Sequence, residues 1–536
     1  MGIPYYFYVI TKSYDGILLD ALPTDLKCTH LFFDFNGLIH PSTQKHLKTF
    51  IIAATATPPK DIEKGIMSAI WKDMIALVNM VDPSGTVQIY IDGVAPIAKM
   101  AQQRKRRFMS IYRKRLTGES TLWDTNAISP GTTFMTRLHA SIRAHIRLSK
   151  SKTYTFHFSS SDEVGEGEHK IFHTIADKHA SPDEVKVIYG MDADLIMLAL
   201  FSHIPKIFLL RENSQAPDQH IYLNIDELRK GILKDLKNNY QWQIDITNDC
   251  YDDASKQVIE SYGVICFLLG NDFIPHPVSI NLKKGGLEDI LVQAGKLWNT
   301  LEGPLIDIST DTINWGFMSQ LIEVLGKHEN DAIFDIVSDY HKKRPMHYQD
   351  KTQEIEAYPL IHKDPLVTDM LFKIDQKKWR MYYYKSLFVS NFNDTTVILS
   401  ACDLYLKGIL WTYHYYKRKP KNSDWYYPYN YAPTLRDVTN YLTCQMSYYE
   451  SLPKTKEWAS KETFCTPIVQ LLSILPKESA GVLPPKYKKL MEEHKGLAYL
   501  YPTTYKIKTF MKTKLWECSQ VLPPMNIEFV KKCVAA

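Results

Sequence analysis

The sequence has little net charge and no paired cysteine motif. Its 64 Lys and Arg residues nearly balance 59 Asp and Glu residues, which leaves a formal net charge of +5 over 536 residues. Composition alone therefore does not indicate a polyanionic partner. The eight cysteines include no C-x-x-C pair and no spacing typical of zinc sites, so we expect reduced thiols in an intracellular protein.

Signals for membrane attachment are also missing. The N-terminus has no basic stretch ahead of an apolar one, and Tyr6 stands where a myristoylation signal needs Ser or Thr. No apolar run approaches the ~20 residues that span a bilayer. We expect a protein without a membrane anchor, folded throughout because it has no repeat and no low-complexity tract.

The order of apolar segments predicts an α/β fold. Short apolar or β-branched runs at 30–35, 86–92, 184–190 and 205–210 alternate with longer helical stretches. This pattern is typical of a mostly parallel central sheet flanked by helices. We expect an α/β domain over residues 1–300, a helical connecting segment over 301–375, and a mainly helical, aromatic-rich lobe over 376–536.

Carboxylates gather where the predicted strands and apolar runs end. They occur in FFDFNG, YIDGVAP, GEGEHK, YGMDADLIML and FLLGNDFIPH, and several stand beside glycine. The carboxyl edge of a parallel sheet is where open α/β folds bind ligands. The candidate residues are Asp34, Asp92, Glu166, Glu168, Asp192, Asp194 and Asp272.

Clustered carboxylates of this kind predict a metal site. They repel one another unless a cation neutralises them, and oxygen ligands without His or Cys favour a hard ion such as Mg²⁺. Two such ions ~3.5 to 4 Å apart clamp a scissile phosphate. Any one Asp is equally explained as a helix N-cap or turn residue. That explanation does not cover the adjacent pairs GEGE and DAD.

A basic helix is expected directly after Asp92. Residues 99–116 carry eight Lys or Arg and no acid, and Lys99, Gln103, Arg106 and Arg107 are spaced to share one face. Read alone, RKRR also fits a solvated surface or a nuclear-localisation signal. A face with two guanidinium groups near a metal ligand is suited to grip a phosphate, and a terminal 5′ phosphate is the first candidate.

These motifs together resemble the Xrn family of 5′→3′ exoribonucleases. MGIPYYFYVI, FFDFNGLIH, DGVAPIAKMAQQRKRRF, GEGEHKI, GMDADLIMLAL, LLGNDFIPH and WYYPYNYAP follow in the family's order and cover nearly the whole chain. The resemblance implies a PIN-like 5′-nuclease core and degradation of single-stranded RNA with a 5′ monophosphate to mononucleotides. It also implies that the seven carboxylates bind two Mg²⁺ ions, with Mn²⁺ as a substitute.

The resemblance further implies a substrate pocket. Lys99, Gln103, Arg106 and Arg107 match the family's 5′-monophosphate pocket, His40 matches a histidine that stacks on the leading base, and Trp425 matches a base-gripping tryptophan. Two positions depart from the family pattern, because Ser423 replaces a second tryptophan and Asn430 replaces a histidine. Base stacking is worth ~1 to 3 kcal/mol per base, so we expect a weaker grip on RNA.

Two other functions stay open at this point. A flap-type DNA endonuclease shares an Asp-rich α/β core, but the stretch after Asp272 lacks that family's Gly-Ile-Gly hairpin, and GEGEHK stands in place of GEAEA. A non-catalytic RNA-binding subunit is the other alternative, against which the unsubstituted carboxylates argue. We expect a monomer in the cytoplasm, with the nucleus as the alternative. The C-terminal extensions of the family's large cytoplasmic members are absent from the sequence, so the resemblance does not extend to docking of a decapping partner, and protein partners stay open.

Overall fold

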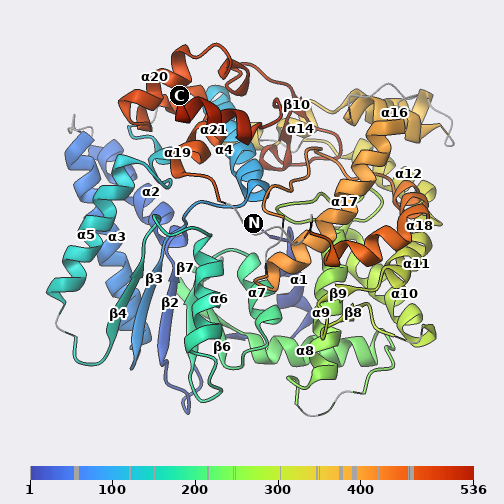
Figure 1. Cartoon of the computed structure of the whole chain (residues 1–536), viewed down its shortest axis with the longest axis horizontal. Helices are drawn as coiled ribbons and strands as arrows, with labels where there is room; N and C mark the ends of the chain where they lie inside the picture. The colour runs from blue at the N-terminus through green and yellow to red at the C-terminus, as the bar shows by residue number, and fades with distance from the viewer. Residues whose placement is uncertain are drawn as a thin grey trace.

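The computed structural model describes most of the chain and is built around one seven-stranded sheet (Figure 1). The described residues are 2–53, 59–119, 122–149, 151–213, 216–245, 247, 249–301, 303–345, 348, 350–373, 378–388, 395–419, 422–456, 458 and 464–536. The sheet consists of β1 (Leu18–Leu19), β2 (His30–Asp34), β3 (Thr86–Tyr90), β4 (Thr155–Ser159), β5 (Lys186–Tyr189), β6 (Ile207–Asn213) and β7 (Ala216–Asn224).

The strand order is β1-β7-β6-β5-β2-β3-β4, and the strands from β6 to β4 all run parallel. β7 runs antiparallel to β6, and β1 antiparallel to β7, so only one edge departs from the parallel pattern. The prediction of a mostly parallel sheet is confirmed, and all four predicted strands are present as β2, β3, β5 and β6. The sequence analysis did not predict β1, β4 or β7.

Helices cover both faces of the sheet because the central strands are apolar on both. Leu31 and Phe33 of β2 pack with α3 and α5, whereas Phe32 points to α6 and α7. The helices up to residue 300 are α1 (Tyr6–Ser13), α2 (Asn36–Ala53), α3 (Pro59–Val81), α4 (Ile97–Thr117), α5 (Thr133–Leu148), α6 (Gly167–Lys178), α7 (Asp194–Ser202), α8 (Ile225–Asn238), α9 (Asp253–Cys266) and α10 (Gly286–Thr300).

The rest of the chain is mainly helical, as predicted, and packs against the sheet domain. Its helices are α11 (Trp315–Gly326), α12 (Glu329–Lys342), α13 (Lys351–Glu356), α14 (Tyr358–Ile361), α15 (Pro365–Thr368), α16 (Trp379–Leu387), α17 (Thr395–Tyr416), α18 (Leu435–Ser451), α19 (Pro467–Ile474), α20 (Pro485–Glu493) and α21 (Ile527–Ala535). Two small hairpins pair β8 (Ile306–Asp307) with β9 (Thr312–Ile313) and β10 (Ile507–Lys508) with β11 (Ser519–Gln520).

Two contacts between distant segments position the site. The largest apolar core runs from Phe32 and α7 into α17, so the helical region shares its interior with the sheet domain. The C-terminal helices α19 and α21 lie beside α4, whose Met100 belongs to their apolar cluster (Figure 1).

The three-part division of the chain stays a prediction. The expected boundary at 300 coincides with the end of α10, and the expected boundary at 375 and 376 lies outside the described residues. Among the described helices, none is both long and apolar enough to cross a membrane.

Candidate active site

The seven predicted carboxylates come from separate elements and meet at the carboxyl edge of the parallel strands. Asp34 ends β2, Asp92 follows β3, and Asp192 lies between β5 and α7, whose first residue is Asp194. Glu166 caps the start of α6, with Glu168 in its first turn. Asp272 follows the short 3₁₀ turn Phe267–Leu269 after α9. The convergence that the sequence predicted is therefore present.

Lys99 of α4 holds four of these carboxylates together. Its Nζ lies 2.8 Å from Glu166 Oε2, 3.2 Å from Asp272 Oδ2, 3.6 Å from Asp194 Oδ2 and 4.0 Å from Glu168 Oε1. The side chains of the lysine and of these partners are at most 8% exposed, so the ion pairs are weakly screened. Burial opposes the charged lysine, but the surrounding carboxylates outweigh it and raise the pKa of Lys99 well above its usual value.

One ammonium group does not neutralise so many carboxylates. Burial and the charges of Asp92 and Asp192 raise the pKa of Asp34 well above its usual value. Burial and the neighbouring carboxylates raise the pKa of Asp194 to about 7, and burial raises that of Glu168 strongly. This mutual repulsion indicates a site suited to added positive charge, and the all-oxygen donor set fits hard divalent cations.

The start of α6 fixes Asp92. The backbone N–H of Gly167 donates to Asp92 Oδ1 at 2.6 Å, and the backbone N–H of Asp92 donates to the Asn36 side chain at 3.2 Å. A Cβ at position 167 would lie 3.0 Å from the carbonyl oxygen of Tyr90 and 3.2 Å from Asp34 Oδ1. A side chain at this position would push these neighbours away by a few tenths of an ångström, so glycine keeps Asp34 and Asp92 where they are.

Three residues that donate hydrogen bonds to the carboxylates were not predicted from the sequence. Tyr415 and Tyr416 of α17 donate their hydroxyls to Glu166 and Asp194, and Gln102 Nε2 donates to Asp272 Oδ2 at 3.1 Å. The tyrosines appeared in the sequence only as part of an aromatic-rich run, GILWTYHYY. No local pattern could connect them to acids more than two hundred positions earlier in the chain.

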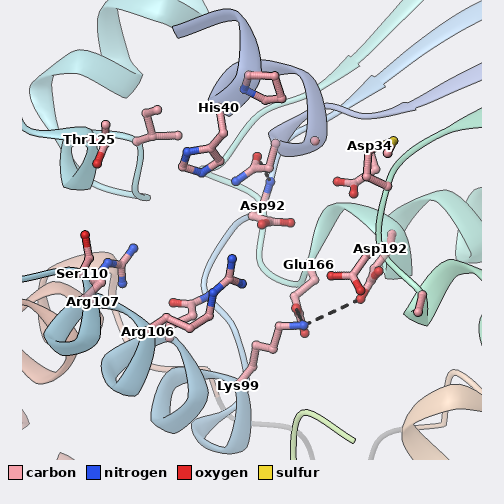
Figure 2. A pocket seen from close by; sticks show the side chains of 18 of the residues that line it. Asp34, His40, Asp92, Lys99, Arg106, Arg107, Ser110, Thr125, Glu166 and Asp192 are labelled. Atoms are coloured by element: carbon pink, nitrogen blue, oxygen red, sulfur yellow. Dashed lines mark hydrogen bonds and ion pairs between the residues drawn. The ribbon is translucent and has the colours of Figure 1, made fainter. Parts of the chain in front are cut away.

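A cavity of about 700 Å³ opens beside the carboxylates and reaches the basic face of α4. Figure 2 shows Arg106 and Arg107 on one side and Asp34, Asp92 and Asp192 on the other, with His40 near the basic end. All four predicted residues of α4 line this cavity: Lys99 lies beside the carboxylates, and Gln103, Arg106 and Arg107 follow further along the helix.

Two of the three guanidinium nitrogens of Arg107 donate hydrogen bonds to neighbouring side chains. Its Nε donates to Asn126 Oδ1 at 2.9 Å and its Nη2 to Ser129 Oγ at 2.8 Å. In the part of the chain that the structure describes, its buried Nη1 has no hydrogen-bond partner. A buried guanidinium donor without a partner is costly, so this position is suited to an anionic ligand.

Comparison with known proteins agrees with this site. Residues 1–213 match the family model described as the N-terminus of the XRN 5′-3′ exonucleases, and residues 253–377 and 367–531 match the Xrn1 helical domain. The chain belongs to the Xrn family. Nucleases of this family are metal-dependent.

Three Xrn relatives illustrate the extent of the match. The human 5′-3′ exoribonuclease 1 is 27% identical over 98% of this chain and 33% of its own length. A Schizosaccharomyces pombe 5′-3′ exoribonuclease 1 is 23% identical over 98% of this chain and 47% of its own, and a Yarrowia lipolytica 5′-3′ exoribonuclease 2 is 24% identical over 95% and 64%. The chain therefore spans less than two thirds of each of these relatives.

Of the two aromatic residues that the Xrn resemblance implies for substrate binding, one lines the cavity and the other is buried in the core. His40 lines the cavity, and its enclosure together with the charges of Arg106 and Arg107 lowers its pKa to about 4, so its ring is neutral near pH 7. Trp425 is buried in the core, 5.1 Å from Trp411 between ring centroids, and is not among the residues that line the cavity. A role for Trp425 in gripping bases stays a prediction.

Proposed function

We propose that this Xrn-family chain is a 5′→3′ exoribonuclease that removes mononucleotides from single-stranded RNA carrying a 5′ monophosphate. The observation that carries the proposal is that one cavity is lined both by carboxylates of the cluster and by Arg106 and Arg107, and that the buried Nη1 of Arg107 has no hydrogen-bond partner among the described residues. Such a cavity can hold a terminal phosphate at one end while the next phosphodiester bond lies at the carboxylates. The names of the relatives, 5′-3′ exoribonuclease 1 and 2, support the same reaction.

Two Mg²⁺ ions fit the carboxylate cluster, with Mn²⁺ as a substitute. Bound there, they would supply Lewis-acid activation of the attacking water and of the scissile phosphate. Asp34, Asp92, Glu166, Glu168, Asp192, Asp194 and Asp272 are the residues that would hold them. Lys99, Tyr415 and Tyr416 orient these carboxylates, because each donates to at least one of them.

The basic end of the cavity selects the substrate in this proposal. Arg106 and Arg107 bind the 5′ monophosphate with Gln103, and His40 stacks as a neutral ring on the leading base. Lys99 completes this phosphate pocket at the carboxylate end of the cavity, which it also lines. A cytoplasmic location and a monomeric state are also part of the proposal.

The test follows degradation of 3′-labelled, 5′-monophosphorylated RNA in Mg²⁺ and in EDTA. We expect mononucleotides from the 5′ end, no cutting of circular RNA, and no activity in EDTA. Asp192→Ala and Asp194→Ala should abolish activity in folded protein, and Asp331→Ala, an exposed acid on α12, should not. Early internal fragments or preferred cutting of branched DNA would support a flap-type endonuclease, and equal rates in Asp194→Ala would contradict a metal-dependent site.

A further inference from the structure

A second group of metal-ligating side chains lies at the opposite edge of the sheet. His30 begins β2, His179 follows the last residue of α6, and Glu184 precedes β5. Their ligand atoms lie within 4.8 Å of one another. Four residues of β2 separate His30 from Asp34, which is about 13 Å along a strand. The group is therefore separate from the carboxylate cluster.

The contacts within the group are too long for hydrogen bonds. His30 Nε2 lies 3.5 Å from Glu184 Oε1, and His179 Nδ1 lies 3.8 Å from Glu184 Oε2. Hydrogen bonds between such atoms are roughly 2.7 to 3.2 Å long. Tetrahedral ligands about 2.0 to 2.1 Å from a zinc ion stand roughly 3.3 to 3.4 Å apart, slightly closer than the two histidine nitrogens lie to the oxygens of Glu184.

Two atoms of the group are buried without a hydrogen bond. In the described part of the chain, His30 Nε2 and Glu184 Oε2 make no hydrogen bond. Unsatisfied buried polar atoms are uncommon in folded proteins and call for an explanation, such as an ion. Burial lowers the pKa of both histidines and so favours the neutral ring.

In each histidine, the ring nitrogen that does not approach Glu184 is hydrogen-bonded to a neighbouring side chain. His30 Nδ1 lies 2.8 Å from Thr86 Oγ1, and His179 Nε2 lies 2.9 Å from the side-chain amide of Gln88. The oxygen and nitrogen of an amide can exchange places. With the oxygen of Gln88 turned toward His179, that ring donates through Nε2 and presents Nδ1 as a lone pair.

The remaining hydrogen bonds accommodate this arrangement. The amide nitrogen of Gln88 then donates to the Tyr90 hydroxyl, which in turn donates to Thr174, 2.8 Å away. Thr86 accepts from His30 and donates to the oxygen of Gln88. Partners of this kind fix the tautomer of metal-binding histidines and tune the metal affinity.

We propose that His30, His179 and Glu184 bind one Zn²⁺ ion as a structural site that joins the starts of β2 and β5 to the end of α6. Two nitrogens and one carboxylate suit Zn²⁺ better than Mg²⁺. The side chains of His179 and Glu184 are 14% and 29% exposed, which leaves a path for the ion and space for water as a fourth ligand.

Metal titration of the purified full-length chain tests this site. Protein stripped with a chelator and kept in excess Mg²⁺, to occupy the oxygen-rich cluster, is titrated with Zn²⁺ by calorimetry and with Co²⁺ by visible absorption. We expect the unmodified chain to bind one more Zn²⁺ than the His30→Gln/His179→Gln variant. We also expect only the unmodified chain to show the intense visible bands of tetrahedral Co²⁺.

Three further variants decide between a bound ion and a plain ion pair. His328→Gln, an exposed histidine at the start of α12, should bind as much Zn²⁺ as the unmodified chain. Thr86→Val leaves all three proposed ligands in place but removes the hydroxyl that bonds His30 and Gln88, and it should weaken Zn²⁺ binding by roughly 10- to 100-fold. If the double variant does not fold, Glu184→Gln replaces it and should also lose the ion. Equal Zn²⁺ stoichiometry in the unmodified chain and a folded ligand variant would overturn the proposal.

Discussion

At the scale of single residues, the carboxylates depend on neighbours that never touch the cavity. Tyr415 and Tyr416 donate to Glu166 and Asp194 from a helix at the far end of the sequence. Hydrogen-bond partners orient metal-binding groups and adjust their basicity. Removing such a partner typically lowers metal affinity or activity by 10- to 100-fold. These tyrosines therefore act as positioning residues in the proposed reaction.

Tyr416→Phe should slow RNA degradation by roughly 10- to 100-fold and raise the Mg²⁺ concentration needed for half-maximal rate. The reason is that Asp194 loses the hydroxyl that orients it. Tyr413→Phe on the same helix is the matched control, because that hydroxyl donates to Glu260 instead. Mg²⁺ titrations of initial rate compare the two variants, and an unchanged Mg²⁺ requirement in Tyr416→Phe would contradict the positioning role.

Asp194 also predicts how pH changes stability. Its pKa is about 7 in the fold and 3.8 ordinarily, so between these values the metal-free fold binds more protons than the unfolded chain. Stability without metal should therefore fall as pH rises through this window, and Mg²⁺ should raise the melting temperature more at about pH 8 than at about pH 5. Thermal unfolding with EDTA or Mg²⁺ measures this. A Mg²⁺ effect independent of pH would count against a repulsive carboxylate cluster.

At the scale of elements, the local sequence pattern predicted what each segment contributes to the site. β2, β3, β5 and β6 and the carboxylates after them followed from apolar runs and parallel-sheet geometry. The basic face of α4 was predicted as one phosphate pocket, and this stays a prediction, with Lys99 at the carboxylate end of the cavity. Arg107 lies eight positions beyond Lys99, about 12 Å along a helix, so this face extends from the carboxylates along the cavity.

The start of α6 is the element most sensitive to added volume. Gly167→Ala would put a Cβ against the Tyr90 carbonyl and Asp34, and it should lower the rate by roughly tenfold or more, because a misplacement of about 1 Å can cost 10²-fold. Gly481→Ala, where a Cβ meets nothing within 4 Å, is the control. Circular dichroism checks that both proteins fold. Equal initial rates would show that this approach is not needed.

At the scale of the whole molecule, the site is assembled from both halves of the chain. Three aromatic rings of the sheet domain pack against α17: Phe201 on Tyr413, Phe267 on Tyr416 and Phe273 on Trp411, with ring centroids 6.1, 5.5 and 4.8 Å apart. The sequence could not predict these contacts, because they join positions far apart along the chain. The aromatic residues of α17 therefore form part of the hydrophobic core as well as part of the site.

A fragment of residues 1–300 should fail to fold stably, because removing α17 exposes the aromatic face that it covers. The expected result is aggregation or a non-cooperative melt of the fragment, measured by circular dichroism beside the full chain. A soluble fragment with a sharp melting transition would show that the sheet domain is independent of the helical region.

The central claim is that the basic end of the cavity recognises a 5′ phosphate. Its most direct test compares initial rates of Arg106→Ala and Arg107→Ala on RNAs that differ only in a 5′ monophosphate or a 5′ hydroxyl. Hydrogen bonds to charged groups are worth about 1.5 to 3 kcal/mol, so the rate on monophosphorylated RNA should fall roughly tenfold to a hundredfold or more. The slow rate on 5′-hydroxyl RNA should hardly change.

Arg113→Ala is the control from the same helix, since Arg113 pairs with Glu356 3.3 Å away at the surface. It should leave both rates close to those of the unmodified chain. Selective loss on monophosphorylated RNA in the two cavity variants is the result that this account predicts. An equal loss on both RNAs would contradict it and reduce the basic face to a nonspecific contact with the RNA backbone.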